Sequence, residues 1–289
     1  MADLGYAGAL SQRCNPFQDR ELARQALYGS TARVTQRTSI LKQAKVAGDD
    51  PLQVIVDMAL FAGIQPGAKR LRVLDVGCGR GGTTARLADD LQPTRLVALD
   101  LSPALLNAAR QRTPTPLECV CADFHAMPVR SGSFDLVVAA FCLYHSAYPE
   151  QVVRQLAATL RVGGVAVVTT KSADSYRTLD ELVYASGLDQ QSLERPSLYA
   201  SFHSDNAAQI ISTALQVEHM LHDLNRFAFP TLCDAAAYLA TSPKYRFPQP
   251  AGQPIGADGI EQGLRQAHDP SQPVITESTV TYCQARRHA

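Results

Sequence analysis

The sequence predicts an α/β fold built on a doubly wound, mostly parallel sheet. Its central stretch, residues 71–100, joins an apolar run ending in glycine, a helical segment and a second apolar run ending in an acid. Short runs of branched residues that end at glycine are typical of buried parallel strands. Strand-like and helical segments then alternate at short intervals to about residue 170, which favours parallel strands joined by helical crossovers.

Composition sets the class of protein. The 289 residues, 46% of them hydrophobic, suffice for one large domain. Lys and Arg (27) balance Asp and Glu (27), and this neutral charge disfavours a nucleic-acid partner. No apolar run reaches membrane-spanning length, and the first residues do not resemble a signal peptide. Seven cysteines without a C-x-x-C pair indicate reduced thiols. We expect a cytoplasmic protein without a metal or a membrane partner, and a homo-oligomer is left open.

The segment before the first strand, residues 1–66, is expected to be helical. Residues 19–28 have a helical pattern, and Asp50-Pro51 is a favourable helix start because Asp caps the helix and Pro suits its first turn. These helices either cover the sheet or form a lid over the glycine loop. The rest of the chain, residues 67–289, is expected to form the core.

Further elements follow in order. A helix is expected to start at Ser102-Pro103 and to end near Arg112, and a helix with Val153 and Leu156 on one face precedes Gly163-Gly164. The expected strands are 117–121, 134–140 and 165–170. A helical insertion rich in aromatic residues occupies about 171–206. After it we expect a helix at 207–214, a strand at 215–221, a helix at 230–241, an irregular segment at 242–273 and a final strand at 274–284.

Acidic residues stand at the expected strand ends. Asp75, Asp100 and Asp123 each close or follow a strand, and the fourth strand leads into residues 141–145. In open α/β sheets, ligands bind outside the carboxyl ends of the strands. The loop glycines at positions 77, 79, 81 and 82 satisfy both G-x-G-x-x-G, a dinucleotide fingerprint, and G-x-G-x-G. The glycines alone therefore leave the kind of cofactor open.

Five blocks decide between these motifs. In order they are Leu-Asp-Val-Gly-Cys-Gly-Arg-Gly at 74–81, Asp100, Ala-Asp-Phe at 122–124, Ser-Phe-Asp-Leu-Val at 133–137 and Leu-Arg-Val-Gly-Gly at 160–164. The series resembles class I S-adenosylmethionine-dependent methyltransferases of the small-molecule type, which includes quinone-pathway and natural-product enzymes. The resemblance covers about residues 66–170 by motif and the rest by element order. It implies a Rossmann-like, seven-stranded sheet with an antiparallel last strand. A nicotinamide cofactor would explain Asp100 but not the other blocks together.

The resemblance implies S-adenosylmethionine as cofactor and gives roles to individual residues. Asp75 and the backbone around Gly77 suit the ammonium group, and Asp100 suits the two ribose hydroxyls. Asp123 would accept from the adenine amino group, and the Phe124 backbone would bond a ring nitrogen. The complete expected cofactor set is Tyr28, Asp75, Gly77, Gly79, Asp100, Leu101, Asp123, Phe124 and Phe141.

The implied reaction is methyl transfer to an O, N or C atom of a small molecule, such as a secondary-metabolite intermediate. His145 is the candidate general base, because histidine titrates near neutral pH, although a purely structural role is equally open. Tyr144 would line the acceptor site or donate to the acceptor, and His203 is a second candidate base. Two alternative functions are an RNA or protein methyltransferase and a non-catalytic cofactor-binding partner.

Overall fold

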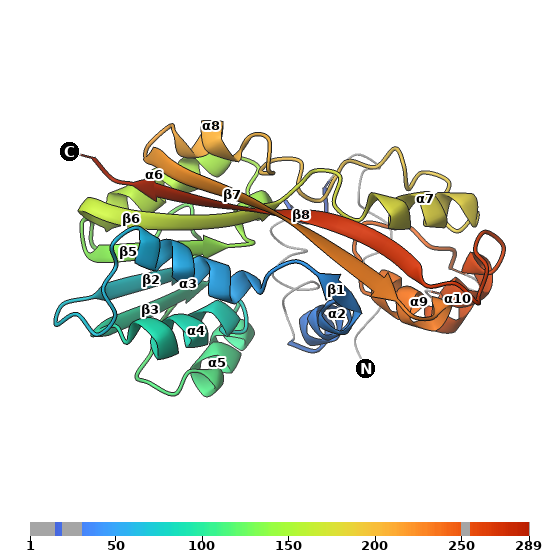
Figure 1. Cartoon of the computed structure of the whole chain (residues 1–289), viewed down its shortest axis with the longest axis horizontal. Coiled ribbons are helices and arrows are strands. Elements are labelled where there is room, and N and C mark those ends of the chain that lie inside the picture. The colour runs from blue at the N-terminus through green and yellow to red at the C-terminus, as the bar shows by residue number, and fades with distance from the viewer. Residues whose placement is uncertain (1–14, 19–30, 250–254, 289) are drawn as a thin grey trace.

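The protein forms one mixed sheet covered by helices (Figure 1). The computed structural model describes residues 15–18, 31–249 and 255–288. The eight strands lie in the order β1-β7-β8-β6-β5-β2-β3-β4. Within these ranges no helix combines the length and the apolar composition that crossing a membrane requires.

Five parallel strands make the central sheet: β2 (Arg72–Val76), β3 (Arg95–Asp100), β4 (Glu118–Cys121), β5 (Phe134–Ala140) and β6 (Leu160–Lys171). The last strand, β8 (Val274–Arg286), runs antiparallel between β6 and β7 (Gln216–Phe229). The mostly parallel sheet with an antiparallel last strand is therefore confirmed. The expected count of seven strands is exceeded by one, because the three-residue β1 (Lys45–Ala47) pairs with β7.

Helices cover both faces of the sheet, because side chains alternate along each strand. Val73 of β2 packs with α3 (Pro51–Phe61) and α4 (Gly82–Leu91) on one face. Its neighbour Leu74 packs with α6 (Pro149–Thr159) on the other. Helix α5 (Pro103–Arg112) packs against β3 and β4.

The two expected helix starts have the capping geometry that the sequence suggested. The Asp50 carboxylate accepts from the Leu52 N–H at 3.1 Å, and Pro51 begins α3. The Ser102 hydroxyl accepts from the Leu105 N–H at 3.3 Å, and Pro103 begins α5. Each cap supplies a partner to a backbone donor that the helix itself leaves unsatisfied.

Strands β7 and β8 continue past the end of β6 and carry a second group of helices (Figure 1). This outer part comprises α2 (Thr31–Ala44), α7 (Arg177–Ala185), α9 (Leu232–Ala240) and α10 (Ala257–Leu264). The short α8 (Ala207–Ile211) follows α7 in the sequence but lies outside this group and packs near α6 (Figure 1). The strand expected at 215–221 is therefore shorter than the observed β7. Pairing with β8 extends β7 to Phe229, beyond the residues that alternate between apolar and polar.

Helix α10 lies in the segment that was expected to be irregular. Its two glycines suggested a loop, yet both permit close packing. A side chain at Gly263 would place its Cβ 2.5 Å from the Leu188 side chain, and one at Gly259 would lie 2.4 Å from Ile255. The glycines therefore allow the helix to approach its neighbours closely.

Candidate active site

The loop between β2 and α4 contains three glycines with positive φ. Gly77 (φ 65°), Gly79 (φ 55°) and Gly81 (φ 75°) adopt the left-handed conformation that side chains disfavour. A Cβ at Gly77 would lie 2.6 Å from the Cβ of Cys142, and one at Gly81 would lie 2.6 Å from the Cα of Ala109. A Cβ at Gly79 would meet nothing within 4 Å. Packing therefore requires two of the glycines, and the third leaves the backbone open to a ligand.

Asp75 is a buried carboxylate with an unsatisfied oxygen. Its residue is 1% exposed, and its Oδ2 accepts from the Thr84 hydroxyl at 2.6 Å. Its Oδ1 is buried and has no hydrogen-bond partner among the described residues. Burial raises the pKa of Asp75 to about 7; the Thr84 hydrogen bond opposes this shift, and the nearby Asp100 charge adds to it. An external cation would satisfy this oxygen and stabilise the charged form.

Asp100, at the end of β3, is tied to the glycine loop. Its Oδ2 accepts from the Gly79 N–H at 2.9 Å, and its Oδ1 accepts from the Ser102 N–H at 2.9 Å. Burial raises its pKa, and the backbone hydrogen bonds from Ser102, Gly79 and Leu101 oppose that shift. The carboxylate thus lies beside the open position at Gly79, with its orientation fixed by the backbone.

Asp123 begins a chain of side-chain hydrogen bonds. Its Oδ1 accepts from the backbone N–H of His125 at 2.9 Å and lies 2.8 Å from Nδ1 of the same residue. The Nε2 of His125 lies 2.7 Å from the Ser146 hydroxyl, which also accepts from the Tyr148 N–H. These bonds hold the carboxylate in one orientation. Phe124, half-buried, packs against the main apolar core.

The residues after β5 form a tight turn that packs against the glycine loop between β2 and α4. Phe141 has a left-handed backbone (φ 55°), and its N–H donates to the Thr169 carbonyl at 2.9 Å. The next residue, Cys142, contacts the Val76 carbonyl through its thiol at 3.3 Å and lies against Gly77. A short 3-10 turn, η2 (Leu143–His145), follows and presents Tyr144 and His145.

Four rings from three distant segments meet above this turn, and we call them the aromatic group: Phe17, Tyr144, His145 and Tyr199. The Phe17 ring lies 4.6 Å from His145 and 5.6 Å from Tyr144, between ring centroids. Tyr199 of the insertion lies edge-on to Tyr144 at 4.9 Å. The Asn15 amide donates to the carbonyls of Ser197 and Leu198, both at 3.1 Å, and so joins the N-terminal segment to the insertion.

His145 is half-buried and neutral. Its Nδ1 lies 3.1 Å from the Phe17 carbonyl, so this nitrogen carries the hydrogen and donates it. Burial lowers the pKa of His145 to about 4; the Phe17 contact opposes this shift, and the positive charge of Arg37 adds to it. A neutral imidazole can accept a proton, but this low pKa makes it a weak base.

Tyr28 and His203 were the two other candidates. Tyr28 falls outside the described residues. His203 makes its contacts within its own turn: its backbone N–H donates to Asn206, and its Nδ1 accepts from the Asp205 N–H at 3.3 Å. The structure brings together Asp75, Gly77, Gly79 and Asp100 at one edge, with Tyr144 and His145 on the next strand end.

Sequence reasoning missed three contributors to this region: His125, Phe17 and Lys171. For His125 a signal existed, because it stands two residues after an expected site acid. Phe17 gave no signal, since it reaches the site only through contacts more than a hundred residues away along the chain. Lys171, the last residue of β6, lies among aromatic rings from three segments.

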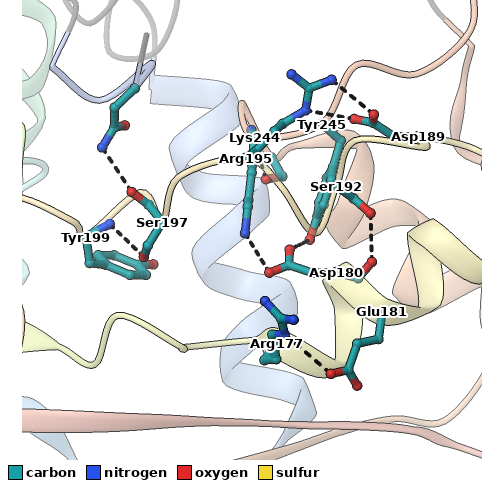
Figure 2. Close-up of polar contacts among 12 residues, drawn as sticks. Arg177, Asp180, Glu181, Asp189, Ser192, Arg195, Ser197, Tyr199, Lys244 and Tyr245 are labelled. Atoms are coloured by element: carbon teal, nitrogen blue, oxygen red, sulfur yellow. Dashed lines mark hydrogen bonds and ion pairs between the residues drawn. The ribbon is translucent and has the colours of Figure 1, made fainter. Parts of the chain in front are cut away.

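Buried ion pairs hold the insertion against the C-terminal part of the chain (Figure 2). Asp180 accepts from the Lys244 ammonium at 2.5 Å and from the Tyr245 hydroxyl at 2.9 Å. Asp189 pairs with Arg195 at 3.0 Å and accepts from a backbone N–H at 2.7 Å. Because such charges are costly to bury unpaired, these contacts favour one position of the insertion.

Comparison with known proteins agrees with this geometry. Residues 74–168, which span the glycine loop to β6, match the family model of a methyltransferase domain. Residues 74–168 therefore carry a methyltransferase domain, and the strand order around it agrees with the predicted mostly parallel, doubly wound sheet. The predicted methyltransferase domain is confirmed over these residues, and S-adenosylmethionine is the cofactor of the class that the sequence resembles.

Particular relatives are similar over part of their length. Malonyl-[acyl-carrier protein] O-methyltransferase of Enterobacter lignolyticus is 33% identical over 155 residues, which cover 51% of this chain and 60% of the relative. The same enzyme of a Paenibacillus species is 32% identical over 130 residues, which cover 42% and 47%. The chain thus spans about half the length of these relatives, and only 20% of a biotin biosynthesis bifunctional protein of Cellvibrio japonicus.

Solved structures show the same fold at low identity. A Bacillus halodurans protein, provisionally described as a methyltransferase, has a TM-score of 0.58 at 15% identity, covering 82% of this chain and 100% of that one. The [4+2]-cyclase SpnF has a TM-score of 0.55 at 16% identity, covering 96% and 98%. At these identities the likeness concerns the fold alone.

Proposed function

We propose that this protein transfers the methyl group of S-adenosylmethionine to an O, N or C atom of a small-molecule acceptor, such as a secondary-metabolite intermediate. One observation carries the proposal: the unsatisfied Asp75 Oδ1 and the open position at Gly79 lie at neighbouring strand ends, where Asp100 accepts from the Gly79 N–H. The cofactor supplies an activated methyl group, so the protein's task is binding and orientation.

The chain's own residues divide the binding task. Asp75 would pair with the ammonium of the methionine moiety, with the backbone at Gly77 beside it. The Asp100 carboxylate, already oriented by two backbone N–H groups, has lone pairs left for the ribose hydroxyls. Asp123 would accept from the adenine amino group, and the Phe124 backbone would bond the ring. Leu101 and Phe141 would supply apolar contacts at the two strand ends.

The acceptor would lie beside the aromatic group. The neutral net charge and the buried rings favour a small, partly apolar molecule over a nucleic acid. The described segment 15–18 and the insertion at about 171–206 meet over Tyr144 and His145, so we propose that they act as a lid that excludes water. The O-methyltransferase names of the relatives favour oxygen as the acceptor atom. Good alignment of the acceptor would supply about 7–11 kcal/mol of the barrier reduction.

Calorimetric titration with S-adenosylhomocysteine, with NAD and NADP as controls, tests the cofactor. Saturable binding of S-adenosylhomocysteine alone is expected. Methyl transfer from S-adenosylmethionine to a panel of small-molecule acceptors, followed by mass spectrometry, then tests turnover. Binding of a nicotinamide cofactor instead would contradict the proposal, and cofactor binding without turnover on any acceptor would favour a non-catalytic role.

The pKa of Asp75 predicts a pH-dependent cofactor affinity. Only the charged carboxylate can pair with an ammonium, and with a pKa of about 7 its population rises strongly between pH 6 and pH 8. Affinity for S-adenosylhomocysteine should therefore increase about tenfold over this range. The stability of the ligand-free protein changes in the opposite direction. Because the pKa of Asp75 in the folded protein lies above its ordinary value of 3.8, the free energy of unfolding falls as pH rises from about 4 to 7.

Asp75→Asn provides the comparison. At pH 8 this variant should bind S-adenosylhomocysteine more weakly than the wild type does. It should also lack the roughly tenfold rise in affinity between pH 6 and pH 8 that ionisation of Asp75 gives the wild type. Ionisation of the ligand itself affects both proteins equally and cancels in the ratio of their affinities. Calorimetry at pH 6, 7 and 8 measures this ratio, and a ratio that stays constant with pH would remove the role proposed for Asp75.

His145→Gln tests the proposed base. The glutamine amide can still donate to the Phe17 carbonyl, so cofactor affinity should stay within about threefold of the wild type. Turnover should fall by about 10², the lower end of the usual contribution of a general base, because a pKa of about 4 makes His145 a weak base. Because the pKa of His145 is about 4, its titration should leave wild-type kcat constant between pH 6 and pH 8. Full turnover of the variant would show that the residue only shapes the site.

A further inference from the structure

Lys171 places an ammonium group among aromatic rings at the carboxyl end of β6. Its Nζ lies 4.6 Å from the ring centroid of Tyr176 and 5.8 Å from those of Phe141 and Tyr199. It also donates a hydrogen bond to the Tyr176 hydroxyl. We call the rings of Phe141, Tyr176 and Tyr199 the Lys171 cage. The cage attracts a cation through the ring faces and provides no negative charge.

No carboxylate in the described parts of the chain forms an ion pair with Lys171. This contrasts with Lys244, whose ammonium is paired with Asp180. A second cation lies nearby: the Arg37 guanidinium is 5.5 Å from the Tyr238 ring and 5.8 Å from the Phe17 ring. Tyr238 in turn lies 5.9 Å from Tyr176 of the cage. Positive charge therefore gathers on both sides of these buried rings.

The surrounding tyrosines do not supply the missing negative charge. Burial raises the pKa of Tyr199 and of Tyr176, although Lys171 and Arg37 act against the shift for Tyr199, and Arg37 for Tyr176. Both hydroxyls are thus neutral at physiological pH. A half-buried ammonium surrounded by neutral rings is well suited to bind an anion.

The cage also adjoins the methyl-transfer site. Phe141 follows β5, and the next residue, Cys142, packs against Gly77 of the glycine loop. On the other side, Tyr199 contacts Tyr144 of the aromatic group. A molecule that contacts Lys171 would therefore lie between the cofactor loop and the rings that we assign to the acceptor.

We propose that Lys171 binds an anionic group of the acceptor, so that the substrates are small, partly apolar molecules bearing a carboxylate or a phosphate. This inference rests on the proposed methyl transfer, for which it names the substrate class. Lysine suits the role because its single charge on a flexible stem can follow anions of different shape.

Matched probes that differ in charge test the proposal. The probes are 3-phenylpropanoate, its neutral isostere 3-phenylpropanamide, and 2-phenylethyl phosphate. Each is titrated into the protein with and without saturating S-adenosylhomocysteine and followed by calorimetry and ligand-observed NMR. The wild type should bind at least one anion ten times more tightly than the amide. The stronger anion distinguishes a carboxylate site from a phosphate site.

Variants identify the residue responsible. Lys171→Met keeps the length of the side chain without its charge and should abolish the preference for the anion, whereas Lys171→Arg should retain most of it. Lys69→Met, an exposed lysine just before β2 and thus at the opposite edge of the sheet, serves as the control and should behave like the wild type. The proposal is overturned if the wild type binds neither anion, binds the amide as well, or keeps its preference in Lys171→Met. The titrations of the probes in the absence of S-adenosylhomocysteine report on Lys171 alone. Failure of the protein to bind S-adenosylhomocysteine would therefore count against the proposed methyl transfer and not against the anion site.

Discussion

Asp100→Asn is expected to weaken binding of S-adenosylhomocysteine at least 100-fold. The carboxylate would accept from two ribose hydroxyls, and hydrogen bonds to a charged group each contribute about 1.5–3 kcal/mol. The amide that replaces it also turns an N–H toward a backbone N–H, either that of Gly79 or that of Ser102. Calorimetry at pH 7.5 measures the loss.

The fold should tolerate this substitution, because Asn has the same shape and neutralising a buried carboxylate removes a desolvation cost. Thermal unfolding should therefore stay within a few degrees of the wild type. Asp90→Asn is the matched control, since Asp90 lies on α4 and pairs only with Arg86 at 2.5 Å in the described structure. An affinity of Asp100→Asn within tenfold of the wild type would show that the ribose is not held there.

Gly79→Leu should also eliminate cofactor binding, for a different reason. Gly79 has no neighbour within 4 Å of an added Cβ, so the new side chain enters the space in which the cofactor would lie. Its φ of 55° adds a strain of about 1–2 kcal/mol. The variant should thus fold with a modest loss of stability and show no saturable binding of S-adenosylhomocysteine.

Gly132→Leu separates strain from obstruction. Gly132 has a φ of 67° and likewise nothing within 4 Å of an added Cβ, but it lies in the turn before β5. The two variants should lose similar stability in urea unfolding, and only Gly79→Leu should lose the ligand. Equal affinity in both would show that the open face of the loop is not the binding site.

The sequence was sufficient for the central sheet because the signals there are local. Apolar runs mark β2 to β6, and the caps at Asp50 and Ser102 mark two helix starts. Strand β1 gave no such signal, since it has three partly exposed residues and exists through pairing with β7. Helix α10 was missed because its glycines suggest a loop until their neighbours are known.

The candidate site likewise has one part that the sequence predicts and one part that it does not. Asp75, Asp100 and the loop glycines follow one another within a recognisable motif, so their proximity could be predicted. The acceptor side could not, because it depends on contacts between remote segments. Phe17 and Tyr199 both reach Tyr144, and no periodicity or motif relates these three positions. The burial that lowers the pKa of His145 also comes from these remote contacts.

The position of β8 has a consequence for the order of folding. This strand, residues 274–286, separates β6 from β7, so β7 and β1 have no place on the sheet until it is present. A ribosome delivers the parallel strands first, and they can associate while the later segments are still being made. The outer helices join only when residues 274–286 have emerged. During synthesis, the nascent chain would hold a nearly complete glycine loop well before it had an enclosed acceptor site.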